Sequence, residues 1–302
     1  MDKKIELSSG FIFDFFNMFA DERLDINSFY NFLQNEGTHA YLEIEKIRKT
    51  GMSKSYLYKD KESEPVYFLR MPYIKEGNPN TKASINKLKA YSKNLRNNID
   101  AIVFLGIGGS YLGCKVLFDV IAGEYWNEDD GKRNGYPRIY FSGNNLDTIQ
   151  SGELAEELQR LSKISACSKS KFNIMLVPIS KSGTTLETII AFMYFYDVLM
   201  KSSNIKTEVT LVTDLNIAET SSPLLQLADK YSWERFDIPK GIGGRFSVFA
   251  NPGLIMLASI GADIELFLFG ARELDKYCQK AAREENPALV NASIKYLSGL
   301  HG

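Results

Sequence analysis

Hydroxyl groups and an ammonium group gather directly after an apolar run near the middle of the chain. Such groups suit a phosphate monoester, because hydroxyls, a lysine and the first N–H groups of a helix can each donate to its oxygens. The simpler alternative is an elaborate helix N-cap, held in part by Glu187. So many donors exceed what a cap uses, which favours a phosphate site. The run FNIMLVPIS leads into the candidate ligands, which are Ser180, Lys181, Ser182, Thr184 and Thr185.

A glycine-rich segment, GIGGSYLG, spans Gly106 to Gly113 and follows another apolar run, AIVFLG. We expect a strand to end and a helix to begin there, and at such a junction free N–H groups and the helix dipole favour an anion. A dinucleotide fingerprint would need glycine at Tyr111, and RIYFSGNN ends without the acidic residue that binds a ribose. Nicotinamide or flavin binding is therefore disfavoured. A tight turn without a ligand remains the alternative for this loop alone.

A third glycine-rich segment presents an arginine, in FDIPKGIGGRFSVFANPGL. Gly241, Gly243 and Gly244 precede Arg245, so a flexible turn places the arginine at the start of an apolar helix. A cation fixed in this way can stabilise negative charge that develops on an oxygen. The alternative is an ordinary surface or salt-bridging arginine, and the surrounding glycines favour the first interpretation.

These three segments need a scaffold, and the apolar pattern predicts one of the α/β class. Near-continuous apolar runs alternate with helix-like stretches, which is typical of a three-layer, Rossmann-like arrangement: a parallel sheet flanked by helices on both faces. Loops at the carboxyl ends of parallel strands can touch one ligand where the strand order changes. The expected strands are AIVFLG, RIYFSG, FNIMLVPIS, EVTLVT and WERFDIP, and the helices between them include SYLGCKVLFDVIAG, LDTIQSGELAEELQRL and TTLETIIAFMYFYDVLMK.

The same pattern divides the chain into three parts. Residues 1–85 are expected to form a helical lead-in that ends in a polar connection rich in Pro and Gly. Residues 86–260 carry the alternating strands and helices. Residues 261–302 are helical again, through stretches such as ENPALVNASIKYLSG.

The composition excludes several classes of partner. The formal net charge of −1 gives no electrostatic reason to expect nucleic acid or an anionic membrane surface. No apolar run reaches the roughly 18 residues of a membrane-spanning helix, and the first residues lack the long apolar stretch of a signal peptide, so a cytoplasmic location is expected. Cys114, Cys167 and Cys278 form no close pair and are expected to be reduced, buried thiols. With His39 and His301 as the only histidines, no histidine-rich metal site is expected.

Taken together and in this order, GIGGSYLG, SKSGTT and GGRFSVFANPGL resemble the glucose-6-phosphate isomerase family, in particular its shorter bacterial members. The resemblance extends from Asp100 to the end of the chain, and ENPALVNASIKYL is similar to the helix that follows in those enzymes. The first 85 or so residues resemble the family only loosely.

The resemblance implies an isomerase that interconverts D-glucose 6-phosphate and D-fructose 6-phosphate through a cis-enediol(ate), as a homodimer and without a cofactor. It implies that residues 86–260 are the first of two sugar isomerase (SIS) domains, and that residues 261–302 lead towards a second one that is absent here. Arg245 matches the arginine that steadies the enediolate. The matched positions are Gly109 and Ser110 at the sugar and Ser180, Lys181, Ser182, Thr184 and Thr185 at the phosphate, and Gly244 is a further substrate- or phosphate-binding position.

The proton chemistry of such an isomerase needs a carboxylate base, a cation near the enediolate and groups that open the sugar ring. In the family the base is a glutamate, and a histidine and a lysine open the ring; all lie in segments beyond the last residues matched here, so we expect them to be missing. His301 lies in SGLHG, which resembles a turn, and Glu187 stands too close to a phosphate to serve well as a base. The alternatives are a non-catalytic phosphosugar-binding SIS module and an isomerase for a related sugar such as mannose 6-phosphate.

Overall fold

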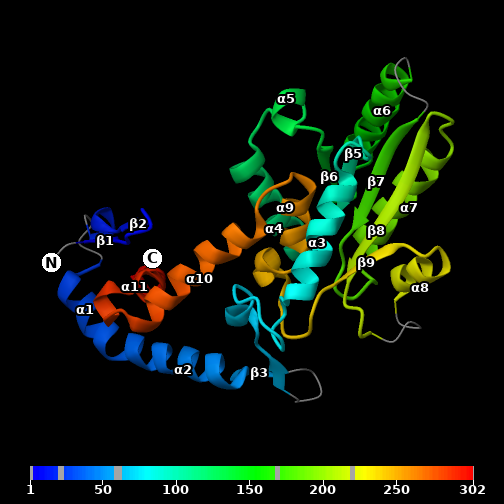
Figure 1. Ribbon diagram of the computed structural model, residues 1–302. Helices are drawn as coiled ribbons and strands as arrows, with labels where there is room; N and C mark the ends of the chain where they lie inside the picture. The colour runs from blue at the N-terminus through cyan, green and yellow to red at the C-terminus, as the bar shows by residue number, and fades with distance from the viewer. Residues whose placement is uncertain (1–2, 20–23, 58–62, 167–170, 218–221, 302) are drawn as a thin grey trace. The chain divides into compact units, whose positions relative to one another are not determined.

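Five strands form one parallel sheet in the computed structural model, which describes residues 3–19, 24–57, 63–166, 171–217 and 222–301. The strand order is β6-β5-β7-β8-β9 (Figure 1), and each neighbouring pair is parallel. These are the five strands that the sequence predicts, so the α/β prediction is confirmed. Their bounds are β5 Ala101–Leu105, β6 Arg138–Ser142, β7 Phe172–Pro178, β8 Ile205–Thr213 and β9 Glu234–Asp237.

Helices cover both faces of this sheet, as predicted (Figure 1). Side chains alternate across a strand, so Ile102 and Phe104 of β5 pack into one apolar cluster while Val103 and Leu105 pack into another. The first cluster also holds side chains of α3 (Lys82–Leu95), α4 (Gly109–Leu117) and α9 (Asn251–Ser259). The second holds side chains of α6 (Thr148–Ser165), α7 (Leu186–Met200) and α8 (Pro223–Lys230).

Three of these helices begin with a side-chain cap, because Ser, Thr and Asp oxygens accept from otherwise unpaired N–H groups. Thr81 forms a capping box with Ser84 at α3, Asp147 caps α6, and Ser222 caps α8 just before Pro223. The starts of α4 and α7 carry no such side-chain bond. A π-helical turn, Phe118–Ala122, follows α4, and a short helix, α5 (Asp130–Arg133), precedes β6.

The contacts between residues divide the chain into two compact units. Residues 70–268 form one unit, and residues 1–69 together with 269–302 form the other. In the second unit, Phe29 and Leu33 of α1 pack with Val290 and Ile294 of α11. The sequence interpretation anticipates the helices of this unit but not its two antiparallel strand pairs, β1–β2 and β3–β4. The bounds are β1 Lys4–Glu6, β2 Ile12–Asp14, α1 Ile26–Gln34, α2 Glu36–Thr50, β3 Met52–Leu57, β4 Ser63–Pro65 and α11 Pro287–His301. The boundary between the two units falls within α10 (Ile264–Lys280).

The structure describes two of the three cysteines and most of the residues that could bind a metal ion. Cys114 is buried, as predicted, and its Sγ donates to the Pro252 carbonyl at 3.1 Å, whereas Cys278 is half-buried. Cys167 lies outside the described residues. Within the described ranges there is no cluster of three His, Cys, Asp or Glu residues suited to a metal ion. None of the helices in those ranges has both the length and the apolar composition that crossing a bilayer requires.

We expect Cys114 to resist alkylation by iodoacetamide in the folded protein. Burial raises the pKa of its thiol to about 12, so very little of the reactive thiolate forms near neutral pH. Burial also raises the pKa of Cys278, but that thiol is only half-buried and should be modified first when peptides are mapped after timed labelling. Labelling in denaturant is the control. Equal rates at Cys114 and Cys278 in the folded protein would contradict this expectation.

Candidate functional site

The two loops singled out in the sequence lie at the point where the strand order reverses. From β5 the chain passes through α4 to β6 on one side of β5, and it then crosses to β7 on the other side. Connections from β5 and β7 therefore diverge onto opposite faces of the sheet, and a crevice at the carboxyl ends of such neighbours is where open α/β sheets bind ligands. GIGGSYLG follows β5, and SKSGTT follows β7.

The first loop turns directly into α4. Gly106 N donates to the Ser142 carbonyl at 3.2 Å, which ties the end of β5 to the end of β6. Gly108, the N-cap of α4, has a φ of 56°, a backbone conformation that residues with a side chain rarely adopt. Gly109 and Ser110 form the first turn of α4. Ser110 is half-buried.

In the second loop some of the predicted ligands face inward and others outward. Ser180 is 1% exposed, and its Oγ lies 2.8 Å from Thr185 Oγ1 and accepts from Gly183 N at 3.1 Å. These two hydroxyls therefore fix the shape of the loop. Ser182 and Thr184 lie further out, and Thr184 Oγ1 donates to Ser182 Oγ at 2.8 Å, a bond exposed to solvent.

Two residues that the sequence interpretation did not single out support this loop. Thr213, the last residue of β8, donates through Oγ1 to the Ser180 carbonyl at 2.7 Å. Ser222 packs against Gly183, where an added Cβ would lie 1.9 Å from Ser222 Oγ. The only hint of Thr213 in the sequence is a hydroxyl at the end of EVTLVT, and no spacing pattern points to Ser222.

The third segment reaches back to the first loop. Gly244–Phe249 forms a 3₁₀ helix, η5, after β9, and a Cβ added at Gly109 would lie 2.2 Å from the carbonyl carbon of Gly244. The two backbones are therefore in direct contact, which glycine alone permits. Ser247 Oγ donates to the Gly244 carbonyl at 2.7 Å and lies 3.3 Å from the Gly109 carbonyl.

A lysine joins the second loop to the third segment. Lys181 is half-buried, and its Nζ donates to the Ile242 carbonyl at 3.1 Å. Arg245 is exposed and makes no hydrogen bond or ion pair with any residue that the structure describes. All three predicted segments thus meet at the carboxyl edge of the sheet and bring two cations with them.

The hydroxyl groups of the second loop do not form a side-chain N-cap for α7, which was the alternative interpretation of this segment. Thr185 occupies the N-cap of α7 but makes no side-chain cap bond, because its hydroxyl is turned to Ser180. The first turns of α4 and α7 therefore both begin without a side-chain cap. Uncapped helix starts next to hydroxyls and cations form an environment in which an anion can accept several hydrogen bonds.

Two carboxyl groups at the same edge of the sheet, those of Asp214 and Asp237, accept hydrogen bonds from backbone N–H groups of the turn after β8. Asp237 Oδ1 accepts from Leu215 N at 2.9 Å, and Asp214 Oδ1 accepts from Asn216 N at 2.9 Å. Burial, reinforced by the charge of Asp214, raises the pKa of Asp237. Their hydrogen bonds fit a structural role in the turn after β8.

Comparison with known proteins gives consistent matches. The family model described as phosphoglucose isomerase matches residues 71–299. A glucose-6-phosphate isomerase from Staphylococcus haemolyticus is 32% identical over 217 residues, which are 71% of this chain and 44% of that protein. The corresponding protein of Fusobacterium nucleatum is 29% identical over 257 residues, which are 82% of this chain and 51% of that one. This chain thus spans about half the length of the curated relatives it matches.

A solved structure supports the fold independently. The crystal structure of a hypothetical protein from Thermus thermophilus superposes with a TM-score of 0.65 at 22% identity, and the match covers 90% of this chain and 55% of that chain. At this identity the likeness concerns the fold alone.

We expect Gly109→Ala to destabilise the protein by about 1–3 kcal/mol, since the added methyl group would overlap the Gly244 backbone unless η5 moves. Urea unfolding would measure the change. The matched control is Gly152→Ala in α6, where an added Cβ meets nothing within 4 Å and where we expect a gain of about 0.5–1 kcal/mol. Equal unfolding midpoints for the two variants would show that Gly109 and Gly244 are not in contact.

Proposed function

Because this chain belongs to the phosphoglucose isomerase family, we propose that the site at the carboxyl edge of its sheet binds a hexose 6-phosphate and takes part in interconverting glucose 6-phosphate and fructose 6-phosphate. The resemblance suggested by the three segments is confirmed at the level of the family. The proposal itself is supported chiefly by one observation. Segments far apart in the sequence, around Gly109, Lys181 and Arg245, are joined by the Gly109–Gly244 contact and the Lys181–Ile242 hydrogen bond.

In this proposal the second loop binds the phosphate. The outer hydroxyls of Ser182 and Thr184, together with N–H groups at the uncapped start of α7, donate to phosphate oxygens. Lys181 adds a positive charge at the side of the loop that faces the third segment. Ser180 and Thr185 act mainly by holding the loop in shape, since their hydroxyls bond to each other.

The sugar would then lie towards the first loop and the third segment. Gly109 and Gly244 carry no side chain, and Ser110 carries a small one, so a ligand can approach the backbone there. During isomerisation a proton moves between C1 and C2, and negative charge develops on the sugar oxygens. Arg245, with no partner among the described residues, supplies the cation that stabilises this charge.

A second candidate is a phosphosugar-binding module without catalysis. Proton transfer between C1 and C2 needs a carboxylate or similar base. Among residues 106–113, 180–187 and 241–253 the one carboxylate is Glu187, and a neighbouring phosphate would repel its charged form. Binding without turnover would favour this candidate. Beyond the site, we propose a cytoplasmic homodimer without a cofactor, as the resemblance implies.

We expect Lys181→Ala to weaken the binding of 6-phosphogluconate by about 10- to 100-fold, because a charge-assisted hydrogen bond to a phosphate is lost. Isothermal titration calorimetry would measure it. Lys201→Ala is the matched control, since Lys201 lies at the other end of α7 and is paired with Asp197. Unchanged affinity in Lys181→Ala would remove the lysine from the phosphate site.

Arg245→Ala should lower turnover of fructose 6-phosphate by about 100- to 1,000-fold while leaving 6-phosphogluconate affinity nearly unchanged, because the arginine acts on charge that develops only during the reaction. A coupled assay of glucose 6-phosphate formation would measure turnover, with mannose 6-phosphate tested in parallel. Arg160→Ala, on the exposed face of α6, is the control. If the unaltered chain binds 6-phosphogluconate but shows no turnover, the binding-module proposal replaces the isomerase.

A further inference from the structure

One half of strand β8 has a backbone edge that no described strand covers. The strand pairs with β7 along Ile205–Val209, but on its other side β9 pairs only with Thr210–Thr213. In the part of the chain that the structure describes, no strand lies beside Ile205–Val209 on the β9 side. The backbone N–H and C=O groups on that side are therefore open to a ligand.

The hydrogen bonds near the end of β8 show which of its residues direct their backbone groups outward. Ser180 N donates to the Val212 carbonyl at 3.0 Å, so even-numbered residues of β8 face β7. Ile238 N donates to the Thr213 carbonyl at 2.8 Å, so odd-numbered residues face the other side. Thr207 lies at the centre of the uncovered stretch, and it therefore directs both its N–H and its C=O outward.

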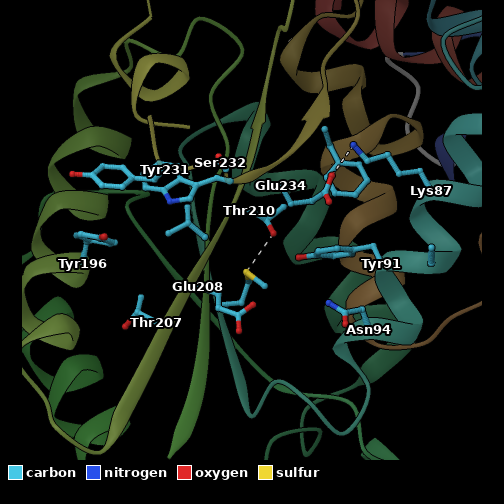
Figure 2. A pocket seen from close by; sticks show the side chains of 15 residues that line it. Lys87, Tyr91, Asn94, Tyr196, Thr207, Glu208, Thr210, Tyr231, Ser232 and Glu234 are labelled. Carbon is cyan, nitrogen blue, oxygen red and sulfur yellow. Dashed lines mark hydrogen bonds and ion pairs between the residues drawn. The ribbon is translucent and has the colours of Figure 1, made fainter. Parts of the chain in front are cut away.

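A groove of about 640 Å³ lies along this edge and has walls on both faces of the sheet. Figure 2 shows Tyr91 of α3 and Glu208 on one side of β8, which we call the α3 face. It shows Tyr196 of α7 and Thr207 on the other side, which we call the α7 face. An extended peptide directs its side chains alternately to two faces, so it matches a groove of this form.

One buried hydroxyl on each face has no hydrogen-bond partner among the described residues. Thr207 Oγ1 is on the α7 face, and Tyr91 Oη is on the α3 face. Tyr91 is 7% exposed, and because burial raises the pKa of its hydroxyl, that group stays protonated and can donate. Thr210 interacts with Tyr91, but the Thr210 hydroxyl donates to Met175 Sδ at 3.3 Å. Unpaired buried hydroxyls are costly, so each face offers a polar anchor to a ligand.

We propose that the occupant of this groove is an extended segment of a different protein, paired antiparallel with Ile205–Val209. In this register the central residue of the segment exchanges two hydrogen bonds with the backbone of Thr207. Its side chain lies directly opposite that of Thr207, so a threonine or serine there bonds to Thr207 Oγ1. The segment thus supplies partners for the strand edge and for the hydroxyl on the α7 face.

The side chains beside Thr207 specify the rest of the segment. Lys206 and Glu208 pair with each other at 2.6 Å, so an acidic residue opposite Lys206 adds a second partner of opposite charge. A glutamine opposite Glu208 can donate to its carboxylate and accept from Tyr91 Oη. Ile205 and Val209 are buried and favour apolar residues opposite them. From its amino end, the segment is therefore apolar, glutamine, threonine, acidic, apolar.

The charges of the groove disfavour a phosphate-bearing ligand. Lys87 is the one cation among its described lining residues, and its Nζ lies 2.7 Å from Glu234 Oε1 and donates to the Arg235 carbonyl. Glu208 and Glu234 would repel a phosphate. The groove therefore differs in chemistry from the candidate site, and this inference does not rest on the proposed function because it involves none of the residues of that site.

The first test measures binding of the fluorescein-labelled peptide Lys-Val-Gln-Thr-Glu-Val-Lys to the full chain by fluorescence anisotropy. We expect saturable binding, weakened at least about tenfold by Thr207→Pro, because proline removes the outward N–H but no hydrogen bond to a described strand. Tyr91→Phe should weaken binding about three- to tenfold through loss of one hydrogen bond. Tyr125→Phe, at an exposed tyrosine outside the groove, is the matched control. Circular dichroism would confirm that each variant is folded.

An exchange of charges tests the register. Replacing the peptide's glutamate by lysine should weaken binding about three- to tenfold, because two lysines then lie opposite each other at Lys206. The variant Lys206→Glu should bind the lysine peptide better than the glutamate peptide. A contact elsewhere on the protein would not show this reversal.

Three results would overturn the proposal. The first is the absence of saturable binding, and the second is equal affinity of Thr207→Pro and the unaltered chain for the peptide. The third is a Lys206→Glu variant that still prefers the glutamate peptide. Loss of peptide binding as the protein concentration rises would also overturn it, because a second copy of the chain would then occupy the edge.

Discussion

The contact between the backbones of Gly109 and Gly244 is the constraint on which the candidate site depends. It brings the segment after β9 onto the first turn of α4, although the two glycines are far apart in the sequence. A further glycine allows η5 to lie close to α9, because a Cβ at Gly253 would lie 2.1 Å from the Val248 carbonyl oxygen. Any side chain at Gly109 or Gly253 would move the arginine that follows Gly244.

The sheet supplies the second constraint. Because β5 and β7 are neighbours whose helices lie on opposite faces, two helix starts converge at one edge, and neither carries a side-chain cap. In the proposed site their N–H groups, the hydroxyls of Ser182 and Thr184 and the charge of Lys181 would act at the same edge of the sheet. An anion site of this kind depends on the order of the strands as well as on the loops.

The sequence predicts the sheet well because its central strands are buried on both faces and so appear as continuous apolar runs, as in FNIMLVPIS. It also locates the loops, because glycines and hydroxyls follow those runs. It does not predict that Ser180 faces inward, since that depends on Thr185 and Thr213, or that Gly109 meets Gly244, since that contact is long-range. The sequence also places the start of β8 three residues too late, because Ile205–Thr207 precede the predicted EVTLVT, and only Glu234–Asp237 of the predicted WERFDIP strand is paired.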